Sequence, residues 1–250
     1  MAADRPQPAE KPPLPAAHPS APAPHGVSAL DGSGDRLAGR LRGFGPLWLL
    51  SFVLIVLGGV VPGGSALLVL LWRSLSRTPW SELGFARPGS WPRTIVLGVV
   101  IGAAFKLLMK SVVMPLLGAD PVNQAYHDLA GNRAAIPGFL FALLVGAGFG
   151  EETLFRGYLF ERLRRLMGRS VGASVATVAI TSALFAAAHL PNQGVPGAEQ
   201  AAVTGLAFGA IYAVTGGLPF VMIAHAAFDL TAYAIIYWDL ETTVAHWVFH

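Results

Sequence analysis

Three short polar motifs interrupt otherwise apolar stretches in the second half of the chain. They are Glu151-Glu152-x-x-x-Arg156, Phe185-x-x-x-His189 and His225-x-x-x-Asp229. Carboxylates and imidazoles are the side chains that serve most often as general acids and bases, and together they also bind zinc. Such a set can therefore activate a water molecule for hydrolysis, relay protons or ions, or hold a metal.

The spacing within each motif predicts how the side chains point from a helix. Residues four apart share one face, so Glu152 and Arg156 can form an ion pair along the helix. Adjacent residues point about 100° apart, so Glu151 and Glu152 cannot share a face. We therefore expect Glu152 and Arg156 to hold the helix in place and Glu151 to be free for chemistry.

The elements that carry these motifs are expected to lie in a membrane. The chain is 54% hydrophobic and 12% charged, against about 25% charged in an ordinary soluble domain. The sequence contains no cysteine, which excludes disulfides and thiolate chemistry. The net charge of +3 comes from arginine clusters beside apolar segments. Such clusters indicate membrane orientation rather than nucleic-acid binding, so we expect lipid as a partner and no nucleic acid.

The fold class predicted from these segments is all-α, a polytopic transmembrane helix bundle. We expect about seven spans (six to eight), at residues 46–61, 65–75, 94–117, 136–165, 171–189, 201–214 and 218–238. The Gly98–Gly102 and Gly146–Gly150 spacings suit close packing between helices.

The flanking segments are expected to lie outside the bundle. Residues 1–42 are rich in proline and alanine and predict a disordered cytoplasmic tail, 43–240 the transmembrane domain, and 241–250 a short C-terminal tail. The first forty residues contain no apolar stretch typical of a cleaved signal peptide. The arginine-rich loops fall on one side, which predicts a multi-pass protein of the cell membrane with a cytoplasmic N-terminus.

Ionisable side chains at membrane depth are energetically costly unless they face a protein interior or water. Glu151, His189, His225 and Asp229 are therefore expected to share one wet cavity. At 1.5 Å per residue, His225 lies roughly 10 Å from the inner end of its span and Asp229 about 6 Å further out. His189 lies about 25 Å from the inner end by the same rise, so a tilted or later-starting helix is needed to bring it in.

In order and spacing, the three motifs resemble those of the CPBP family of intramembrane proteases, also called CAAX-protease or Abi proteins. The resemblance covers roughly residues 80–238, and we expect a prokaryotic member. It implies an intramembrane endopeptidase with Glu151 as the catalytic acid and with His189, His225 and Asp229 completing the site. Glu152, Arg156 and Phe185 would support the first two motifs.

The chemistry of these residues leaves the type of peptidase open. A glutamate in a cavity of low dielectric can act as base and then as acid on a water molecule. His189, His225 and Asp229 also form a zinc-type ligand set, and zinc lowers the pKa of a bound water. The prenyl-protease branch has asparagine where this chain has Asp229. Because an ionised aspartate cannot donate a hydrogen bond, Asp229 must be protonated, orient His225 or bind a metal.

These residues are compatible with three functions. The first is an endopeptidase that cleaves a membrane-anchored peptide or protein. The second is a transporter or ion relay that uses the same buried groups, although no internal repeat is evident. The third is a catalytically silent scaffold or immunity protein. Lys106 and Lys110 lie four apart in one span, where they could balance Glu152, meet a substrate carboxylate or extend toward headgroups.

Overall fold

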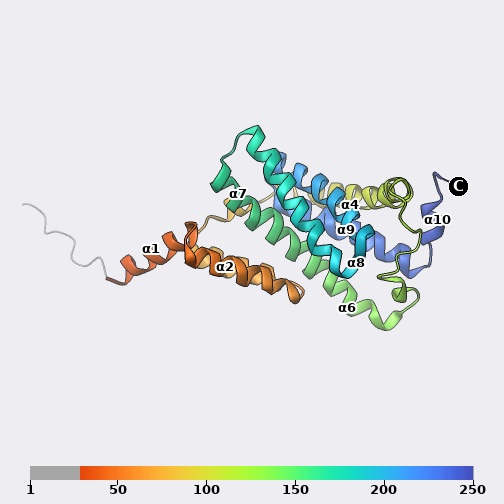
Figure 1. Cartoon of the computed structure of the whole chain (residues 1–250), viewed down its shortest axis with the longest axis horizontal. Coiled ribbons are helices and arrows are strands. Elements are labelled where there is room, and N and C mark those ends of the chain that lie inside the picture. Colours follow the sequence, from red (N-terminus) through yellow and green to blue (C-terminus); the bar gives the residue numbers. More distant parts are fainter. Residues whose placement is uncertain (1–28, 250) are drawn as a thin grey trace, which may run out of the picture.

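The structure, a computed structural model, describes residues 29–249, with side chains from residue 34. Every regular element in this range is helical (Figure 1). The α-helices are α1 (Ala29–Arg42), α2 (Pro46–Leu57), α3 (Gly64–Ser76), α4 (Trp91–Leu108), α5 (Met114–Leu116), α6 (Ile136–Phe141), α7 (Phe160–Met167), α8 (Val171–Thr215), α9 (Leu218–Tyr237) and α10 (Glu241–Ala245). The predicted all-α class is confirmed.

Several of these helices have the length and composition of membrane spans. Four stretches of the described chain qualify, at Trp91–Leu116, Arg133–Met167, Val171–Thr215 and Leu218–Tyr237, and the bent pair Gly34–Arg42 with Pro46–Val60 could provide a fifth. Gly64–Ser76 is apolar but shorter. The chain is thus a multi-pass membrane protein, while the count of about seven spans stays a prediction.

The segments predicted to be tails are helical where the structure describes them. Residues 29–42 form α1, whose Ala38 and Leu41 are buried, and the Trp72 indole donates a hydrogen bond to the Leu41 carbonyl, 3.3 Å away. Residues 1–28 of the predicted tail lie outside the described residues. At the other end, α10 buries Glu241, so the 241–250 segment begins as a packed part of the bundle.

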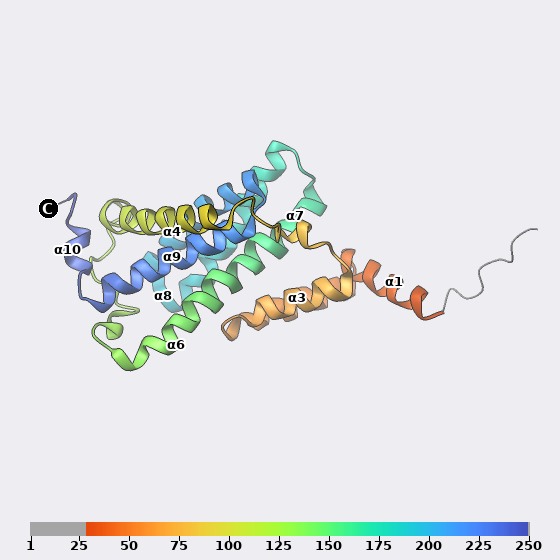
Figure 2. The same ribbon diagram turned by 180° about the vertical axis from the view of Figure 1, so that it is seen from behind.

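Helix α3 lies beside the helix carrying Glu151 (Figure 2) and forms an antiparallel hairpin with α2. The turn between them contains Pro62 and Gly63, and Gly63 has a φ of 77°, a left-handed conformation that glycine adopts without strain. The Ser65 hydroxyl donates to the Ile55 carbonyl at 2.7 Å and ties the two arms together. The tip of this hairpin reaches the face of Gly146 and Gly150, as their spacing predicts.

The helix with the first motif runs without interruption from α6 to α7 (Ile136–Met167), and we call it the motif helix. Between these ends, Ala142–Glu151 and Thr153–Leu159 have the wide turn of a π-helix, in which hydrogen bonds join residues five apart. Only Glu152 separates the two wide stretches. Because a wide turn changes the angle between successive side chains, it alters which residues face the bundle interior.

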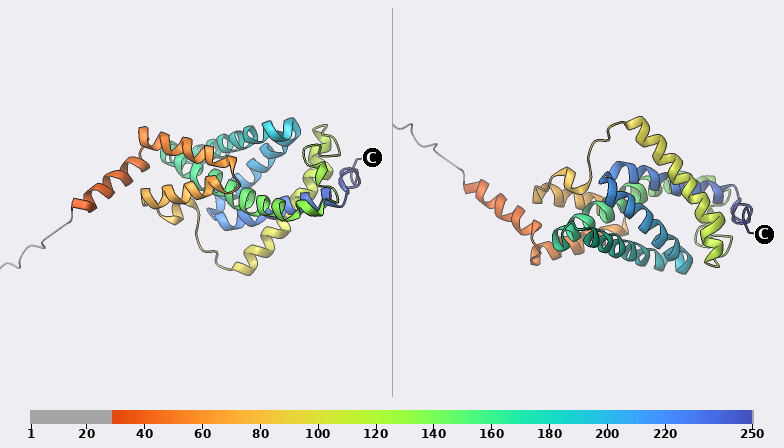
Figure 3. Two further views of the ribbon diagram at one scale, coloured as in Figure 1. Left: turned by 90° about the horizontal axis from the view of Figure 1, so that it is seen from below. Right: turned by 90° about the horizontal axis from the view of Figure 1, so that it is seen from above.

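The sequence of α8 runs through a sharp break at Gly194, where φ is 65° and ψ is −166°. The chain reverses there (Figure 3), and the second half packs back on the first, with Gly205 against Ser182 and Gly209 against Val178. Residues 171–189 and 201–214, predicted as separate segments, thus lie in the two arms of this element. The Phe185 motif is on the first arm.

Helix α4 packs along α9 through its small residues. A Cβ on Gly98 would lie 2.8 Å from the Ile223 side chain, and one on Gly102 would lie 2.1 Å from the Ala224 carbonyl oxygen. The predicted role of this glycine pair in close packing is therefore confirmed. This contact fixes the face that α9 turns toward the motif helix, and so positions the His225 motif.

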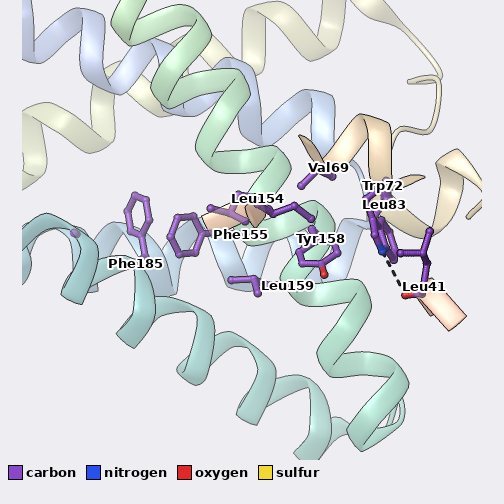
Figure 4. Packing of buried hydrophobic residues seen from close by; sticks show 11 residues of the cluster. Leu41, Val69, Trp72, Leu83, Leu154, Phe155, Tyr158, Leu159 and Phe185 are labelled. Atoms are coloured by element: carbon purple, nitrogen blue, oxygen red, sulfur yellow. Dashed lines mark hydrogen bonds between the residues drawn. The ribbon is translucent and has the colours of Figure 1, made fainter. Parts of the chain in front are cut away.

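The core nearest the site joins the α2–α3 hairpin, the motif helix and α8. Its buried side chains include Val69, Trp72, Leu154, Tyr158 and Phe185, which Figure 4 shows as sticks. The Trp72 and Tyr158 rings pack edge to face with centroids 4.8 Å apart. Burial of these large side chains fixes the rotation of the motif helix about its axis, so that Glu151 faces inward to a cavity.

Candidate active site

A cavity of about 890 Å³ lies between the hairpin tip, the motif helix, α8, α9 and the loop before α6. Its lining includes all four residues predicted to share a wet cavity, namely Glu151, His189, His225 and Asp229. They come from three helices that are separated by tens of residues in the chain. The predicted convergence of these side chains is therefore present in the fold.

Glu151 and Glu152 point in different directions, as their helical spacing predicts. Glu151 is 32% exposed and its carboxylate faces the cavity, with Oε2 3.8 Å from His225 Nε2. Within the described residues, Glu151 Oε2 has no hydrogen-bond partner although it is buried. A buried carboxylate oxygen without a protein donor is suited to hold a water or a substrate proton.

Glu152, in contrast, is completely buried and accepts two hydrogen bonds on a single oxygen. Its Oε1 accepts from Arg156 Nη1 at 2.7 Å and from His225 Nδ1 at 2.6 Å. Arg156 Nη2 also donates to the Gly205 carbonyl on α8 at 3.2 Å. The predicted Glu152–Arg156 pair is present, and it joins the motif helix to both α8 and α9.

The contact with Glu152 determines which nitrogen of His225 carries a proton. A carboxylate accepts hydrogen bonds, so Nδ1 is the donor, and Nε2 is left to face the cavity. There, Nε2 lies 3.5 Å from Asp229 Oδ2 and 3.8 Å from Glu151 Oε2. Glu152 therefore orients the ring through Nδ1, while Asp229 contacts the opposite nitrogen. Asp229 therefore does not orient the His225 ring through Nδ1, because Glu152 accepts that hydrogen bond.

His189 is held in a similar way by its own helix. Its Nδ1 donates to the Phe185 carbonyl at 2.8 Å, so in the neutral imidazole Nε2 carries no proton. The Phe185 ring contacts both imidazoles, with centroid distances of 4.4 Å to His189 and 6.0 Å to His225. It also lies 5.0 Å below the Arg156 guanidinium. Phe185 thus packs against all three polar motifs. His189 lies nearer to His225 than residue counting predicts, because such counting treats the helices as straight and parallel.

Zinc binding can be tested against this arrangement. Each of His189 and His225 donates its Nδ1 proton to an oxygen, as metal-ligating histidines usually do, but Nε2 of His225 lies between the carboxylates of Asp229 and Glu151. However, no three His, Asp or Glu side chains of residues 34–249 are arranged as a metal-binding group. His189, His225 and Asp229 are thus of the side-chain types that bind zinc. To act as ligands of one ion, these three side chains would have to move closer together.

One polar contact in the cavity wall was not predicted from the sequence. Tyr126, in the loop before α6, lines the cavity, and its hydroxyl oxygen accepts a hydrogen bond from Gln193 Nε2 at 3.1 Å. Burial raises the pKa of this hydroxyl, and the charges of Asp229 and Glu151 raise it further. Tyr126 is therefore a neutral donor at neutral pH. No spacing in the sequence indicates it, because its loop meets the cavity only in the folded bundle.

The fold and this site define a class of protein, a multi-pass membrane helix bundle in which carboxylates and imidazoles from three helices line one cavity. Residues 133–231 match the family model described as "Type II CAAX prenyl endopeptidase Rce1-like", and all the predicted site residues fall inside the match. Residues 133–231 therefore belong to the CPBP, or CAAX-protease, family, as their motifs indicate. No curated protein and no solved structure matches the chain.

Proposed function

We propose that this protein is an intramembrane endopeptidase that hydrolyses a peptide bond in a membrane-anchored peptide or protein. The observation that supports this most directly is the meeting of Glu151, His189 and His225 in one cavity, with Glu151 Oε2 free of protein donors. The match to a family of endopeptidases supports the same reaction.

In the proposed mechanism, Glu151 is the general base. Its carboxylate takes a proton from a water molecule, and the water oxygen forms a bond to the peptide carbonyl carbon. Glu151 then gives the proton to the leaving nitrogen as the C–N bond breaks. The unprotonated Nε2 of His189 accepts a hydrogen bond from the same water and aligns it. His225 is fixed by Glu152 beside the base, and Asp229 lies against its other nitrogen.

The tetrahedral intermediate requires a hydrogen-bond donor for its oxyanion. Asp229 cannot donate while ionised. Tyr126 can, because its oxygen already accepts from Gln193 and its own proton remains available. We therefore assign this role to Tyr126. A bound zinc held by His189, His225 and Asp229 would instead polarise the carbonyl and the water.

The experiment is hydrolysis of a fluorogenic membrane peptide by the purified protein in detergent. Glu151→Ala and His189→Ala should each reduce turnover by at least about a hundredfold, since each removes a group that handles the attacking water. Glu82→Ala is the matched control, because Glu82 is a carboxylate of the same chain outside the cavity. Equal turnover by all four proteins would refute the proposal.

The same proteins decide between the other two functions. Proton flux into liposomes that Glu151→Gln abolishes, without peptide hydrolysis, would indicate an ion relay. Stable, folded protein with neither activity would indicate a silent scaffold.

The cytoplasmic position of the N-terminus is also proposed, from the arginine-rich loops. Because the chain has no cysteine, a single introduced cysteine is a unique reporter. Arg87→Cys should resist an impermeant thiol reagent in intact cells, and Asp128→Cys should react. Both residues are exposed. The opposite pattern would reverse the orientation.

A further inference from the structure

A second, smaller cavity of about 230 Å³ adjoins the first, and we call it the side chamber. The two cavities have part of their lining in common, namely Lys106, Asn123, Gln193, Gln200, Ala232 and Ile236. Groups bound in the side chamber would therefore lie next to the Glu151 cavity. Its shared wall is polar, with one ammonium and three carboxamides.

Lys106 is the charged group in that shared wall. It belongs to the membrane-spanning helix α4 and is only 6% exposed. Its ammonium donates to Gln200 Oε1 at 2.8 Å and lies 4.9 Å from the centre of the Phe228 ring. No carboxylate of residues 34–249 lies within ion-pair distance of it. An ammonium has three donors, and burying one without an anion is costly.

Lys110, one helical turn away, shows how this protein neutralises a buried lysine. Its ammonium lies 3.3 Å from Glu241 Oε1 and donates to the Pro121 carbonyl. The Glu241 carboxylate has further partners, because it also accepts from the Asn123 backbone N–H at 2.8 Å and contacts His127 at 3.3 Å. Glu241 therefore forms an ion pair with Lys110 and not with Lys106. Asp120, the other acid in the side chamber, is exposed at the surface.

We propose that the side chamber is a binding subsite for a carboxylate of the substrate, with Lys106 as its anchor. This inference rests on the proposed peptidase function. The carboxylate would supply the anion that Lys106 lacks, and the carboxamides of the shared wall would hold its second oxygen. The group can be a C-terminal carboxylate or an acidic side chain, because both present the same two oxygens. Either would position the adjoining peptide bond toward the Glu151 cavity.

The test measures binding separately from hydrolysis. The probes are four fluorescein-labelled apolar hexapeptides in neutral detergent, observed by fluorescence anisotropy. One ends in a free carboxylate and one in a carboxamide. The other two are carboxamides with an internal glutamate or an internal glutamine. All proteins carry Glu151→Gln, so that bound peptide is not consumed.

We expect one of the acidic peptides to bind about tenfold more tightly than its neutral partner, the size of one charge-assisted hydrogen bond. The pair that shows the difference identifies the source of the carboxylate. Lys106→Met should remove the preference, and Lys106→Arg should keep most of it because the charge remains. Lys110→Arg is the matched control, since it changes the neighbouring lysine but keeps its charge.

The outcomes separate this inference from the function on which it rests. No acid preference, or no binding at millimolar peptide, overturns the side-chamber subsite even if the wild type hydrolyses peptides. If Lys106 only balances the charge of Asp229, Lys106→Met should weaken the binding of acidic and neutral peptides equally. That result also overturns the side-chamber subsite. If Lys106→Met loses the preference while the protein with Glu151 intact does not hydrolyse the fluorogenic membrane peptide, the subsite is supported and the peptidase function is refuted.

Discussion

Glu152→Gln is the substitution that tests most directly how this site is held together. The Glu152 carboxylate is completely buried and receives Arg156 and His225 on the same oxygen, Oε1, while Oε2 has no partner among the described residues. A glutamine can keep its oxygen at the Oε1 position and place its NH₂ group at the vacant Oε2 position. The substitution therefore preserves the shape and both hydrogen bonds and removes only the charge.

The expected loss follows from the two bonds. Hydrogen bonds to a charged group contribute roughly 1.5–3 kcal/mol, and those between neutral groups about 0.5–1.5 kcal/mol. Losing the charge at both bonds should lower the free energy of unfolding by about 2–3 kcal/mol. Glu152→Ala removes the acceptor oxygen as well as the charge, so the buried Arg156 loses both, and the free energy of unfolding should fall by about 3–5 kcal/mol. Turnover should fall as well, since His225 is held less firmly.

The assay is reversible unfolding in mixed micelles with increasing SDS, followed by the fluorescence of the six tryptophans. Glu82→Gln is the control, because Glu82 pairs with Arg165 at 2.5 Å while both side chains are about one-third exposed (33% and 34%). Ion pairs of this kind contribute about 0–1 kcal/mol. If the two glutamine variants lose the same stability, within about 0.5 kcal/mol, the Glu152 contacts do not hold the site and the reasoning is refuted.

Three further predictions concern packing, the oxyanion and the metal. Gly102→Ala should separate α4 from α9 and lower the free energy of unfolding by about 1–3 kcal/mol. Gly138→Ala is the control, because a Cβ there meets open space and should leave the stability unchanged or slightly higher. Unfolding of both variants in SDS measures the difference. Tyr126→Phe should lower kcat about tenfold or more with little change in KM, because it removes a donor to the transition state only. An unchanged kcat would exclude Tyr126 from the oxyanion site. Asp229→Asn should keep much of the activity if Asp229 only contacts His225, while loss of bound zinc together with activity, measured by elemental analysis, would show that it is a ligand.

The parts of the site that depend on one helix could be predicted from the sequence. The Glu152–Arg156 pair and the separation of Glu151 from Glu152 follow from helical periodicity alone. The contact between Glu152 and His225 could not be predicted, because it depends on how the motif helix and α9 are rotated against each other. That rotation is fixed by packing, such as the approach of Gly102 to Ala224.

The fold was predicted less completely where length and composition are ambiguous. Residues 34–42 have few apolar side chains, yet they form part of α1 because Leu41 packs beside Trp72 and Ala38 is buried. Counting residues along straight helices also misplaced His189 relative to His225. The contacts of Phe185 with both rings show that the arms of the bundle approach one another there.

The hairpin tip has an evolutionary consequence. Val56, Pro62 and Gly63 form one wall of the large cavity. They lie outside residues 133–231, the range that contains Glu151, His189, His225 and Asp229. Side chains that line this wall, such as Val56, can change while the residues opposite them stay the same, provided that the packing of Trp72 on Tyr158 is kept. Related proteins could thus acquire a new substrate specificity through substitutions at the tip of this hairpin.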